Sequence, residues 1–414
     1  MCPTSMYSAK NNLKKQGDAI TDMAEDIFGC RILIVDDEDF NRELLAAILE
    51  REGYTKLYFA EDGQDALTKA KEIEPDLIVM DVVMPGMDGI AACRELRTEE
   101  PFKNTPIIIH TFQTDPEERA RIYQAGATDI FPKPVARGEV VNRIKMHLTY
   151  TRMMLGLQDY HQRLTRDLEI ARSMQGALLP DAEDLVSLED SHQISILSQY
   201  EASDELGGDF WGLERLDDDR IFVYVTDFAG HGISAALNTF RLHSLISNYR
   251  NRPGFKIVSP AYYLERLNKD LFQLLPMEQY ATMLCGIIDT RNNTFSYSSA
   301  ASTAPLILKT GTRQIRELDP TGYPLGMIQE AAYDVRVEPF EKGDMLFLYS
   351  DVLVESEDQM GRMIGNEQFL EMCRDSSVNV VEGKHFLQRF QKLFDMYVVR
   401  PLKDDLTAVT LERL

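Results

Sequence analysis

Several acidic side chains in this chain stand directly after apolar segments, where carboxylates can gather around a hard cation. The first group also contains a hydroxyl and an ammonium, and its members are Asp36, Asp37, Asp81, Thr111 and Lys133. Packed carboxylates suit Mg²⁺ because this ion prefers oxygen ligands. A lysine and a hydroxyl beside them suit the oxygens of a transferred phosphoryl group. Any one of these residues has an ordinary explanation as a turn or helix N-cap residue, but all five together favour phosphoryl chemistry.

A second acidic group lies in the C-terminal half, with Asp227 at its centre. Asp227 follows the apolar run Ile221–Val225, and two glycines and a helix-forming segment come after it. Three more carboxylates stand at predicted strand ends: Asp209, Asp351 and Asp404. Carboxylates without a convergent His or Cys predict Mg²⁺ or Mn²⁺. His231 is close to Asp227 in sequence, but it is a weaker candidate ligand because hard cations favour oxygen.

The composition limits the classes of partner and the compartment. The chain has 414 residues and a formal net charge of −23. This length predicts two or three domains. The acidic balance argues against nucleic acid and anionic membrane surfaces as partners, because both are bound through Lys and Arg. Five scattered cysteines, no signal peptide and no long apolar run predict a cytoplasmic protein.

The N-terminal part is expected to contain a polar leader, residues 1–27, and one α/β domain, residues 28–148. Five apolar segments in this domain alternate with helical ones: Ile32–Val35, Leu57–Phe59, Leu77–Met80, Ile107–Ile109 and Thr128–Phe131. Such alternation predicts a doubly wound, five-stranded parallel sheet. Functional residues of these sheets lie beyond the carboxyl ends of the strands, which is where the first acidic group falls.

Residues 149–180 are predicted to form a helical linker without a core of its own. Val141, Ile144 and Leu148 follow three- and four-residue spacing, and a second set that includes Leu164 and Leu168 resumes this spacing out of phase. Such a phase break is typical of a coiled-coil stutter. An amphipathic helix that packs on its own domain explains it equally well. Leu179–Pro180 is expected to end the segment.

Residues 181–414 are predicted to form an α+β domain with two packed antiparallel sheets flanked by helices. The acidic segment 181–190 is predicted to be a loop, and strand Ile194–Tyr200 is predicted to pair with Phe210–Leu213. The other predicted strands are Ile221–Val225, Met283–Ile288, Thr294–Ser298, Leu306–Lys309, Tyr333–Val337, Met345–Tyr349 and Leu406–Leu411. Long helices are predicted around 233–248, 259–275, 366–375 and 384–397.

Residues 30–148 resemble the CheY-like receiver domain of two-component response regulators, and segment Asp81–Gly89 is similar to the acceptor loop of that family. The resemblance implies that Asp81 is the phosphoacceptor and that Thr111 and Lys133 sense the phosphoryl group. It also implies a Mg²⁺ site formed by Asp36, Asp37, Asp81 and the carbonyl of Val83. Two positions depart from the family pattern. Phe112 replaces a small residue and is expected to restrict access to Asp81, and Ile130 replaces the usual switch aromatic.

Residues 165–414 resemble the SpoIIE/RsbU branch of the metal-dependent PPM (2C-type) protein phosphatases. The similar segments, besides the four aspartates, are Glu169–Gln175, Leu178–Pro180, Tyr280–Leu284 and Gly322–Gly326. The resemblance implies a centre with two Mg²⁺ or Mn²⁺ ions, in which Asp227 bridges the ions with help from the Phe228 carbonyl. Asp209 would bind one ion, and Asp351 and Asp404 the other. Two such ions activate a water for attack on a phosphoserine or phosphothreonine.

Two segments differ from the phosphatase pattern. Val352 stands where the family usually has glycine, and a positive φ at that position would misplace Asp351. Segment Ala300–Pro305 contains Ala301, Ser302 and Thr303 where the family usually shows Ala-Gly-His, which predicts a change in specificity or activity.

The two resemblances together imply a response regulator whose output is a metal-dependent serine/threonine phosphatase controlled by phosphorylation of Asp81. The implied partners are a sensor histidine kinase and a phosphorylated anti-sigma-factor antagonist, as in partner-switching pathways that regulate sigma factors. Homodimerisation through the helical linker is also expected. One alternative is a non-catalytic, sigma-factor-binding adaptor with a degenerate PPM-like domain. Another is a linker that serves only as a dimerisation strut.

Overall fold

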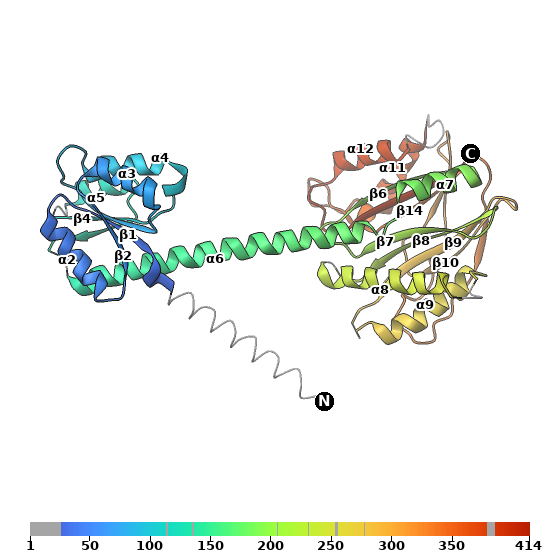
Figure 1. Cartoon of the computed structure of the whole chain (residues 1–414). Helices are drawn as coiled ribbons and strands as arrows, with labels where there is room; N and C mark the ends of the chain where they lie inside the picture. Colours follow the sequence, from blue (N-terminus) through green and yellow to red (C-terminus); the bar gives the residue numbers. More distant parts are fainter. Residues whose placement is uncertain are drawn as a thin grey trace. The chain divides into compact units, whose positions relative to one another are not determined.

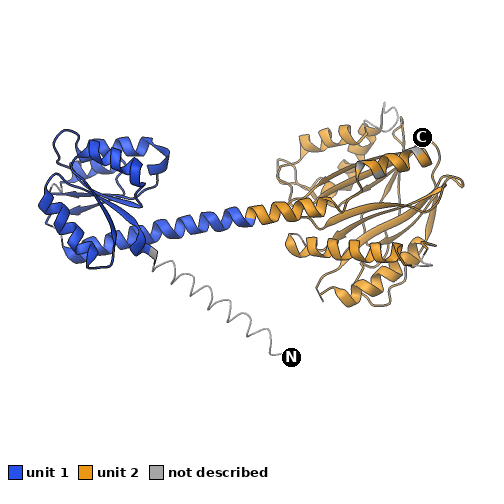
Figure 2. Cartoon of the chain, viewed as in Figure 1, with its two compact units in different colours: residues 1–164 blue, residues 165–414 orange. Residues whose placement is uncertain are grey.

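The computed structural model describes residues 26–112, 115–134, 136–204, 206–230, 232–252, 256–276, 278–378 and 386–414. The chain divides into two compact units, Met1–Leu164 and Thr165–Leu414 (Figure 2). Residues 1–25 of the predicted leader and the candidate residue His231 lie outside the described residues. None of the described helices combines the length and the hydropathy of a membrane span.

The first unit contains the predicted five-stranded parallel sheet, in the order β2-β1-β3-β4-β5 (Figure 1). Its strands are β1 (Arg31–Val35), β2 (Lys56–Ala60), β3 (Leu77–Asp81), β4 (Ile107–Thr111) and β5 (Asp129–Pro132). Its helices are α2 (Asp39–Glu50), α3 (Gly63–Ile73), α4 (Gly89–Thr98) and α5 (Pro116–Gln124), with 3-10 turns η1 (Asp26–Gly29) and η2 (Glu100–Phe102). Apolar residues on both faces of the sheet are buried, as expected for a doubly wound fold.

Aspartates begin three of these helices. Asp62 accepts a hydrogen bond from the backbone N–H of Asp65 at 2.8 Å, and Asp88 accepts one from Ala91 at 2.7 Å. Asp115 accepts bonds from two N–H groups, and a proline follows it at the first helical position. These side chains pair N–H groups that have no partner within the helix, so the sequence itself fixes where the helices start.

Helix α6 (Arg137–Gly176) is a single uninterrupted helix of 40 residues, which begins in the first unit and ends in the second. Val140, Ile144 and Leu148 are buried in the core of the first unit together with Phe131. The apolar residues that follow on α6 are largely exposed. The phase break in the sequence therefore marks the change from a helix face packed on the sheet to an exposed face.

The second unit contains two five-stranded antiparallel sheets, in the orders β13-β10-β9-β8-β7 and β12-β11-β14-β15-β6. Its strands are β6 (Ile194–Glu201), β7 (Asp209–Arg215), β8 (Arg220–Phe228), β9 (Ala281–Asp289), β10 (Thr294–Ala300), β11 (Leu306–Lys309), β12 (Ile315–Glu317), β13 (Arg336–Pro339), β14 (Asp344–Tyr349) and β15 (Leu406–Arg413). Its helices, besides the end of α6, are α7 (Ala182–His192), α8 (Ile233–Arg250), α9 (Pro260–Leu274), α10 (Val352–Glu355), α11 (Gly365–Ser377) and α12 (Phe386–Tyr397).

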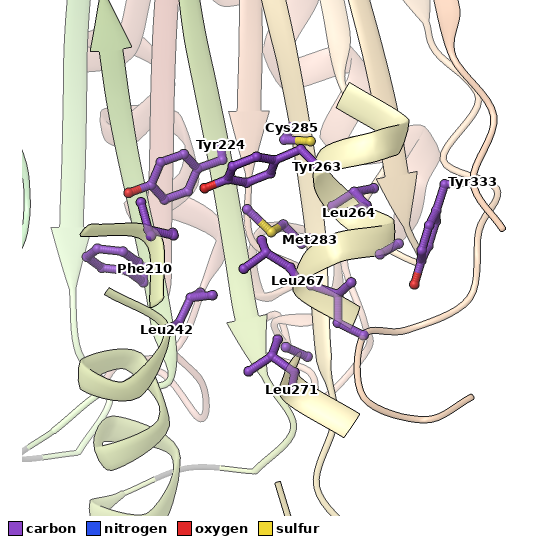
Figure 3. Packing of buried hydrophobic residues seen from close by; sticks show 14 of the residues in the cluster. Phe210, Tyr224, Leu242, Tyr263, Leu264, Leu267, Leu271, Met283, Cys285 and Tyr333 are labelled. Atoms are coloured by element: carbon purple, nitrogen blue, oxygen red, sulfur yellow. The ribbon is translucent and has the colours of Figure 1, made fainter. Parts of the chain in front are cut away.

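Alternating side chains of β8 build the layers of this unit. Val223 and Val225 lie in the core between the two sheets, with Trp211 and Val409. Tyr224 points the other way and packs against α8 and α9, as Figure 3 shows beside Leu242 and Leu267. This alternation is the two-residue period of a strand whose faces are both buried. Residues of α11 and α12 cover the second sheet, so the unit is a sandwich of four layers (Figure 1).

Two local predictions are wrong. Segment 181–190 is not a loop, since Ala182–His192 forms α7, whose Leu188 packs into the core between the sheets. Strand β6 does not pair with β7. It pairs with β15, and β7 pairs with β8, so the two strands belong to different sheets. Sequence proximity suggested a hairpin, but the partner of β6 lies at the far end of the chain.

Candidate functional site

In the first unit, the predicted group gathers at the carboxyl edge of the parallel sheet. Nζ of Lys133, which follows β5, lies 2.8 Å from Oδ2 of Asp36 and 2.7 Å from Oδ2 of Asp81. Asp36 follows β1 and Asp81 ends β3, so segments after three different strands of the sheet supply one cluster. All three side chains are buried. The second oxygen of Asp81 accepts a hydrogen bond from the backbone N–H of Val82 at 2.7 Å.

Burial and charge pairing shift the protonation equilibria of this cluster. Burial raises the pKa of Asp81, and this effect outweighs the opposing hydrogen bond from Lys133. Burial by itself would lower the pKa of Lys133, but its hydrogen bonds with Asp36 and Asp81 outweigh burial and raise it. The lysine therefore carries its charge beside the two carboxylates, where it can contact the oxygens of a phosphoryl group on Asp81.

The remaining residues of the first group lie at the same edge of the sheet. Oxygens of Asp36, Asp37 and Asp81 all lie within 4.8 Å of one another, and Asp37 is exposed. No other group of three or more His, Cys, Asp or Glu among the described residues is as compact. Thr111 is buried at the end of β4, and Val83 is exposed just after β3. An exposed carboxylate beside two buried ones forms an oxygen set that suits Mg²⁺.

The two residues that depart from the receiver pattern differ in exposure. Phe112 is 74% exposed, and its ring centroid lies 5.5 Å from Nζ of Lys133, so the ring borders the cluster. Ile130 is buried in the sheet core. The neighbouring Phe131 packs its ring 4.6 Å from the ring of His110.

The loop after β3 needs a glycine at position 89. A Cβ at this position would lie 1.9 Å from the carbonyl oxygen of Asp81. The N–H of Gly89 donates to the carbonyl of Val82 at 2.9 Å. Only glycine permits this close approach, which folds the loop back onto the end of β3.

In the second unit, Asp209 and Asp227 occupy opposite positions on the antiparallel strands β7 and β8. Asp209 is 2% exposed, and its Oδ2 has no hydrogen-bond partner among the described residues. Burial, and then the charge of Asp227, raise the pKa of Asp209 well above its usual range. Burial, followed by the charges of Asp351 and Asp404, raises the pKa of Asp227 to about 8. A buried carboxylate oxygen without a partner fits a site for a cation.

Asp351 follows β14 and starts the short helix α10. Its φ and ψ are −64° and −23°, and Val352 is the first residue of the helix. Val352 does not have a positive φ. The valine therefore fits the backbone at this position and does not misplace Asp351. Burial and the neighbouring charge of Asp404 raise the pKa of Asp351 to about 6.

Asp351 lines two cavities. One, of about 240 Å³, is lined by Asp209, Asp227 and Asp351 together with the loop that contains Ala301. The other, of about 380 Å³, is lined by Asp351 and Asp404. The four predicted carboxylates therefore line two adjacent cavities that share Asp351 and Glu355, on a wider scale than the cluster in the first unit.

The loop that replaces the Ala-Gly-His pattern borders the first of these cavities. Ala301 has a φ of 57°, a left-handed conformation in which glycine is favoured. The hydroxyl of Thr303 donates to the carbonyl of Tyr349, two residues before Asp351. Ala301 thus adopts a backbone conformation that usually favours glycine.

The Phe228 carbonyl, predicted to assist Asp227, lies beside Gly208. A Cβ on Gly208 would approach this oxygen to 3.0 Å, and the N–H of Phe228 donates to the carbonyl of Gly208 at 3.3 Å. The glycine thus lets the segment before Asp209 lie against the segment after Asp227.

Sequence reasoning did not assign a site role to Gln175 of α6. Its side-chain nitrogen donates to the carbonyl of Gly207 at 2.6 Å and to the Thr239 hydroxyl at 3.0 Å, and its oxygen accepts from the N–H of Gly207 at 3.2 Å. The end of α6 is thereby bonded to the loop two residues before Asp209. The available signal was a glutamine at an apolar position of the predicted helix, where a polar residue needs a partner.

Two families match this chain. Residues 32–145 match the response regulator receiver domain, and residues 217–414 match stage II sporulation protein E (SpoIIE). The transcriptional regulatory protein ResD of Bacillus subtilis (strain 168) is 44% identical over 115 residues, which are 28% of this chain and 46% of ResD. The DNA-binding response regulator MtrA of Mycolicibacterium smegmatis is 37% identical over 118 residues, which are 28% of this chain and 50% of MtrA. The chain spans about half the length of these curated relatives.

The second unit is also similar to a solved structure. The SiaA-PP2C domain of Pseudomonas aeruginosa aligns with a TM-score of 0.53 and 21% sequence identity. The alignment covers 61% of this chain and 98% of that domain. At this identity the likeness concerns the fold, and it agrees with the two antiparallel sheets and flanking helices predicted from the sequence.

Proposed function

We propose that this chain, which belongs to the response regulator receiver family over residues 32–145 and to the SpoIIE family over residues 217–414, is a phosphorylation-controlled protein phosphatase. Its substrate is a phosphoserine or phosphothreonine in another protein. The observation that carries this proposal is the pair Asp209 and Asp227, directly opposite on neighbouring strands at a cavity. One buried oxygen of Asp209 has no hydrogen-bond partner within the described part of the chain.

The carboxylates of the second unit fit divalent cations. Asp227 would bridge two such cations, with the Phe228 carbonyl, because Asp227 lies directly opposite Asp209 and lines the same cavity as Asp209 and Asp351. Asp209 would hold one cation, and Asp351 and Asp404 would hold the second. Bound Mg²⁺ or Mn²⁺ supplies an activated water and neutralises the phosphate charge. The protein's own task is to hold these oxygens in place.

The first unit controls this output in the proposal. Asp81 accepts a phosphoryl group from a sensor histidine kinase: its oxygen bonds to phosphorus while the bond to the donor breaks. Asp36, Asp37 and the Val83 carbonyl hold a Mg²⁺ beside it. Thr111 and Lys133 then contact the phosphoryl oxygens, and Lys133 already lies 2.7 Å from Asp81.

The substrate proposed is an anti-sigma-factor antagonist in its phosphorylated form. This assignment is supported by the SpoIIE family match of residues 217–414 and by the linker segments similar to the SpoIIE/RsbU branch. Dephosphorylation would release a sigma factor through partner switching. The non-catalytic adaptor remains the competing outcome, although the chain keeps all four carboxylates, which an adaptor does not need.

Dimerisation through α6 is part of the proposal. Six exposed apolar residues follow alternating four- and three-residue steps along the helix: Met146, Tyr150, Met153, Leu157, Tyr160 and Leu164. This is a heptad pattern, and such a stripe packs against a second helix of the same kind in a coiled coil. A second copy of this chain supplies that helix in register.

One assay tests the catalytic proposal. Purified chain with Mn²⁺ is incubated with candidate phosphorylated antagonists, and released phosphate is measured with and without acetyl phosphate or phosphoramidate as receiver donor. Asp227→Ala is expected to abolish hydrolysis while circular dichroism shows an intact fold. Asp289→Ala is a matched control, because Asp289 ends β9 of the same sheet outside the cavity lining. Unchanged turnover in Asp227→Ala contradicts the two-metal site.

The same assay separates catalysis from control. Asp81→Asn is expected to retain basal hydrolysis and to lose the response to the phosphodonor, because the variant cannot form the acyl phosphate. A response that persists in Asp81→Asn contradicts the role of the first unit as a switch. Absence of hydrolysis with every phosphorylated antagonist, together with binding of a sigma factor, favours the adaptor.

A further inference from the structure

Asp405, the residue after Asp404, has a buried carboxylate with several donors around it. It is 2% exposed and directly precedes β15. Its Oδ1 accepts a hydrogen bond from the backbone N–H of Ser203 at 2.7 Å and from the Ser203 hydroxyl at 3.1 Å. Ser203 follows β6 of the same sheet.

The other oxygen of Asp405 reaches the opposite sheet. Oδ2 accepts from the N–H of Gly208, and from the N–H of Asp209 at 3.4 Å. Asp209 begins β7, which belongs to the first sheet, whereas Asp405 precedes a strand of the second. A Cβ on Gly207 would lie 2.7 Å from this oxygen, so the glycine loop is packed directly on the carboxylate.

The backbone of Asp405 contacts the remaining two ligand segments. Its N–H donates to Oδ1 of Asp404 at 2.8 Å. Its carbonyl accepts from the hydroxyl of Ser350, the residue before Asp351, at 2.9 Å. One residue thus bonds to the segments that carry Asp209, Asp351 and Asp404.

The chemistry of these contacts requires a carboxylate. Both oxygens accept hydrogen bonds from backbone N–H groups, and a hydrogen bond to a charged acceptor is stronger than one between neutral groups. An amide in the same place would turn its NH₂ group toward a backbone N–H, either that of Gly208 or that of Ser203. That contact brings two donors together and leaves a buried N–H unpaired.

We propose that Asp405 is a positioning residue of the metal centre, which fixes Asp209 of one sheet relative to Asp351 and Asp404 of the other. Asp405 itself does not contact the cations or the substrate. This inference rests on the proposed function, since it takes those three carboxylates as ligands. Its consequence is that Asp405 sets the affinity for divalent cations by holding the ligands at the separation that the ions require.

Metal binding provides the test, because it does not depend on turnover. Mn²⁺ is titrated calorimetrically into the full chain carrying Asp37→Ala, which removes binding at the first unit. Asp405→Asn in this background is expected to weaken Mn²⁺ binding 10- to 100-fold, the usual effect of losing a residue that orients metal ligands. At saturating Mn²⁺ the KM for the phosphoprotein stays within about threefold, since Asp405 does not touch substrate.

Asp344→Asn is the matched control. Asp344 is also buried, accepts a backbone N–H bond from Glu341 at 2.8 Å and lies in the second sheet, but it lines neither of the two cavities at the carboxylates. It is expected to leave Mn²⁺ affinity unchanged, even if it lowers the melting temperature. An equal loss of affinity in both variants overturns the proposal, because a general loss of stability then explains it.

A milder variant covers the case in which Asp405→Asn does not fold. Ser203→Ala removes one hydroxyl donor and leaves the carboxylate in place, and a two- to fivefold weaker Mn²⁺ affinity is expected. If Asp405→Asn folds and binds Mn²⁺ as tightly as the wild type, the proposal is overturned. If Asp405→Asn does not fold, wild-type Mn²⁺ affinity in Ser203→Ala overturns it. If the protein binds Mn²⁺ through Asp405-dependent ligands but hydrolyses no phosphoprotein, the positioning role stands and the proposed substrate is wrong.

Discussion

Burial shifts the pKa values of several side chains in this protein far from their usual values. His110 of β4, in the first unit, is one such residue. It is 6% exposed, its Nε2 has no hydrogen-bond partner among the described residues, and its ring packs on Phe131. Burial, with the nearby charge of Lys133, lowers the pKa of His110 to about 3. The folded protein therefore holds a neutral imidazole directly beside Thr111.

This histidine predicts a pH-dependent stability of the first unit. In the unfolded chain its pKa is 6.5, so the unfolded state binds more protons below that pH, and stability is lost as pH falls from 6.5 toward 3. The loss at pH 5 is about 2 kcal/mol, from 1.36 kcal/mol for each of about 1.5 pH units. Urea unfolding followed by circular dichroism at pH 7 and pH 5 measures it.

His110→Leu is expected to reduce that difference, and His161→Leu, at an exposed position on α6, is the control that keeps it. A pH difference of the same size in His110→Leu and in the wild type contradicts the assignment of the effect to this residue.

Backbone conformation gives a second prediction at the level of a residue. Ala301 has a φ of 57° beside the carboxylate cavity. A left-handed conformation costs an L-residue roughly 1–2 kcal/mol, which exceeds the entropy cost of glycine, roughly 0.5–1 kcal/mol. Ala301→Gly is therefore expected to raise the unfolding free energy by about 0.5–1 kcal/mol.

The neighbouring Ala300 is the control for this substitution. It is fully buried at the end of β10 and does not have a positive φ, so Ala300→Gly is expected to destabilise the fold. The single tryptophan of the chain, Trp211, is buried in β7 of the same unit, and its fluorescence reports the transition. Equal destabilisation by both glycines contradicts the strain at Ala301.

At the level of elements, helix α6 packs apolar residues on the first unit near its start and bonds to the loop before Asp209 at its end. Its first turns bury Val140, Ile144 and Leu148 against the sheet of the first unit. Its last turn presents Gln175 to Gly207, in the loop that leads to Asp209. The helix is therefore anchored in each unit by the side chains of that unit, and its end is bonded to a segment that carries a proposed metal ligand.

Gln175→Leu is expected to lower the unfolding free energy of the second unit by about 1–3 kcal/mol, because the buried N–H and carbonyl of Gly207 lose their partners. Trp211 fluorescence during denaturant unfolding measures this change. Gln158→Leu makes the same substitution at an exposed position of α6 and is expected to stay within about 0.5 kcal/mol of the wild type. Equal midpoints for the two variants contradict a structural role for the Gln175 contacts.

At the level of the whole molecule, the proposed function gives the two units different phosphate chemistry. The first offers Asp81 as a nucleophile with an ammonium 2.7 Å away, which suits a covalent acyl phosphate. The second offers four carboxylates around two cavities, which suits cations and an activated water. In the proposed function, phosphorylation at the first site biases hydrolysis at the second within one chain.

The oligomeric state is predicted from the exposed stripe on α6. Leu157→Glu places a charge at the middle of the heptad pattern, so it is expected to convert a dimer into a monomer at micromolar concentrations. Sedimentation equilibrium measures the change. Gln158→Glu adds the same charge one position off the stripe and is expected to remain dimeric. A wild-type chain that is monomeric at these concentrations contradicts dimerisation through α6.

The sequence alone predicted the elements whose signals are local. The parallel sheet of the first unit follows from five short apolar strands separated by helices, and its acidic residues follow those strands directly. The side chains of β8 alternate between two buried faces, and this follows from the two-residue period of any strand. The resemblance to known motifs added the expected roles of Asp81 and Asp227, which remain predictions.

Only the tertiary structure decided which distant segments meet. Strand β6 pairs with β15 at the other end of the chain, and a local pattern cannot identify such a partner. The bond between Asp405 and Gly208 joins residues 197 positions apart, across two sheets. Hydrogen-bond partners of this kind depend on how strands are ordered within sheets and how the sheets stack, which no short stretch of sequence specifies.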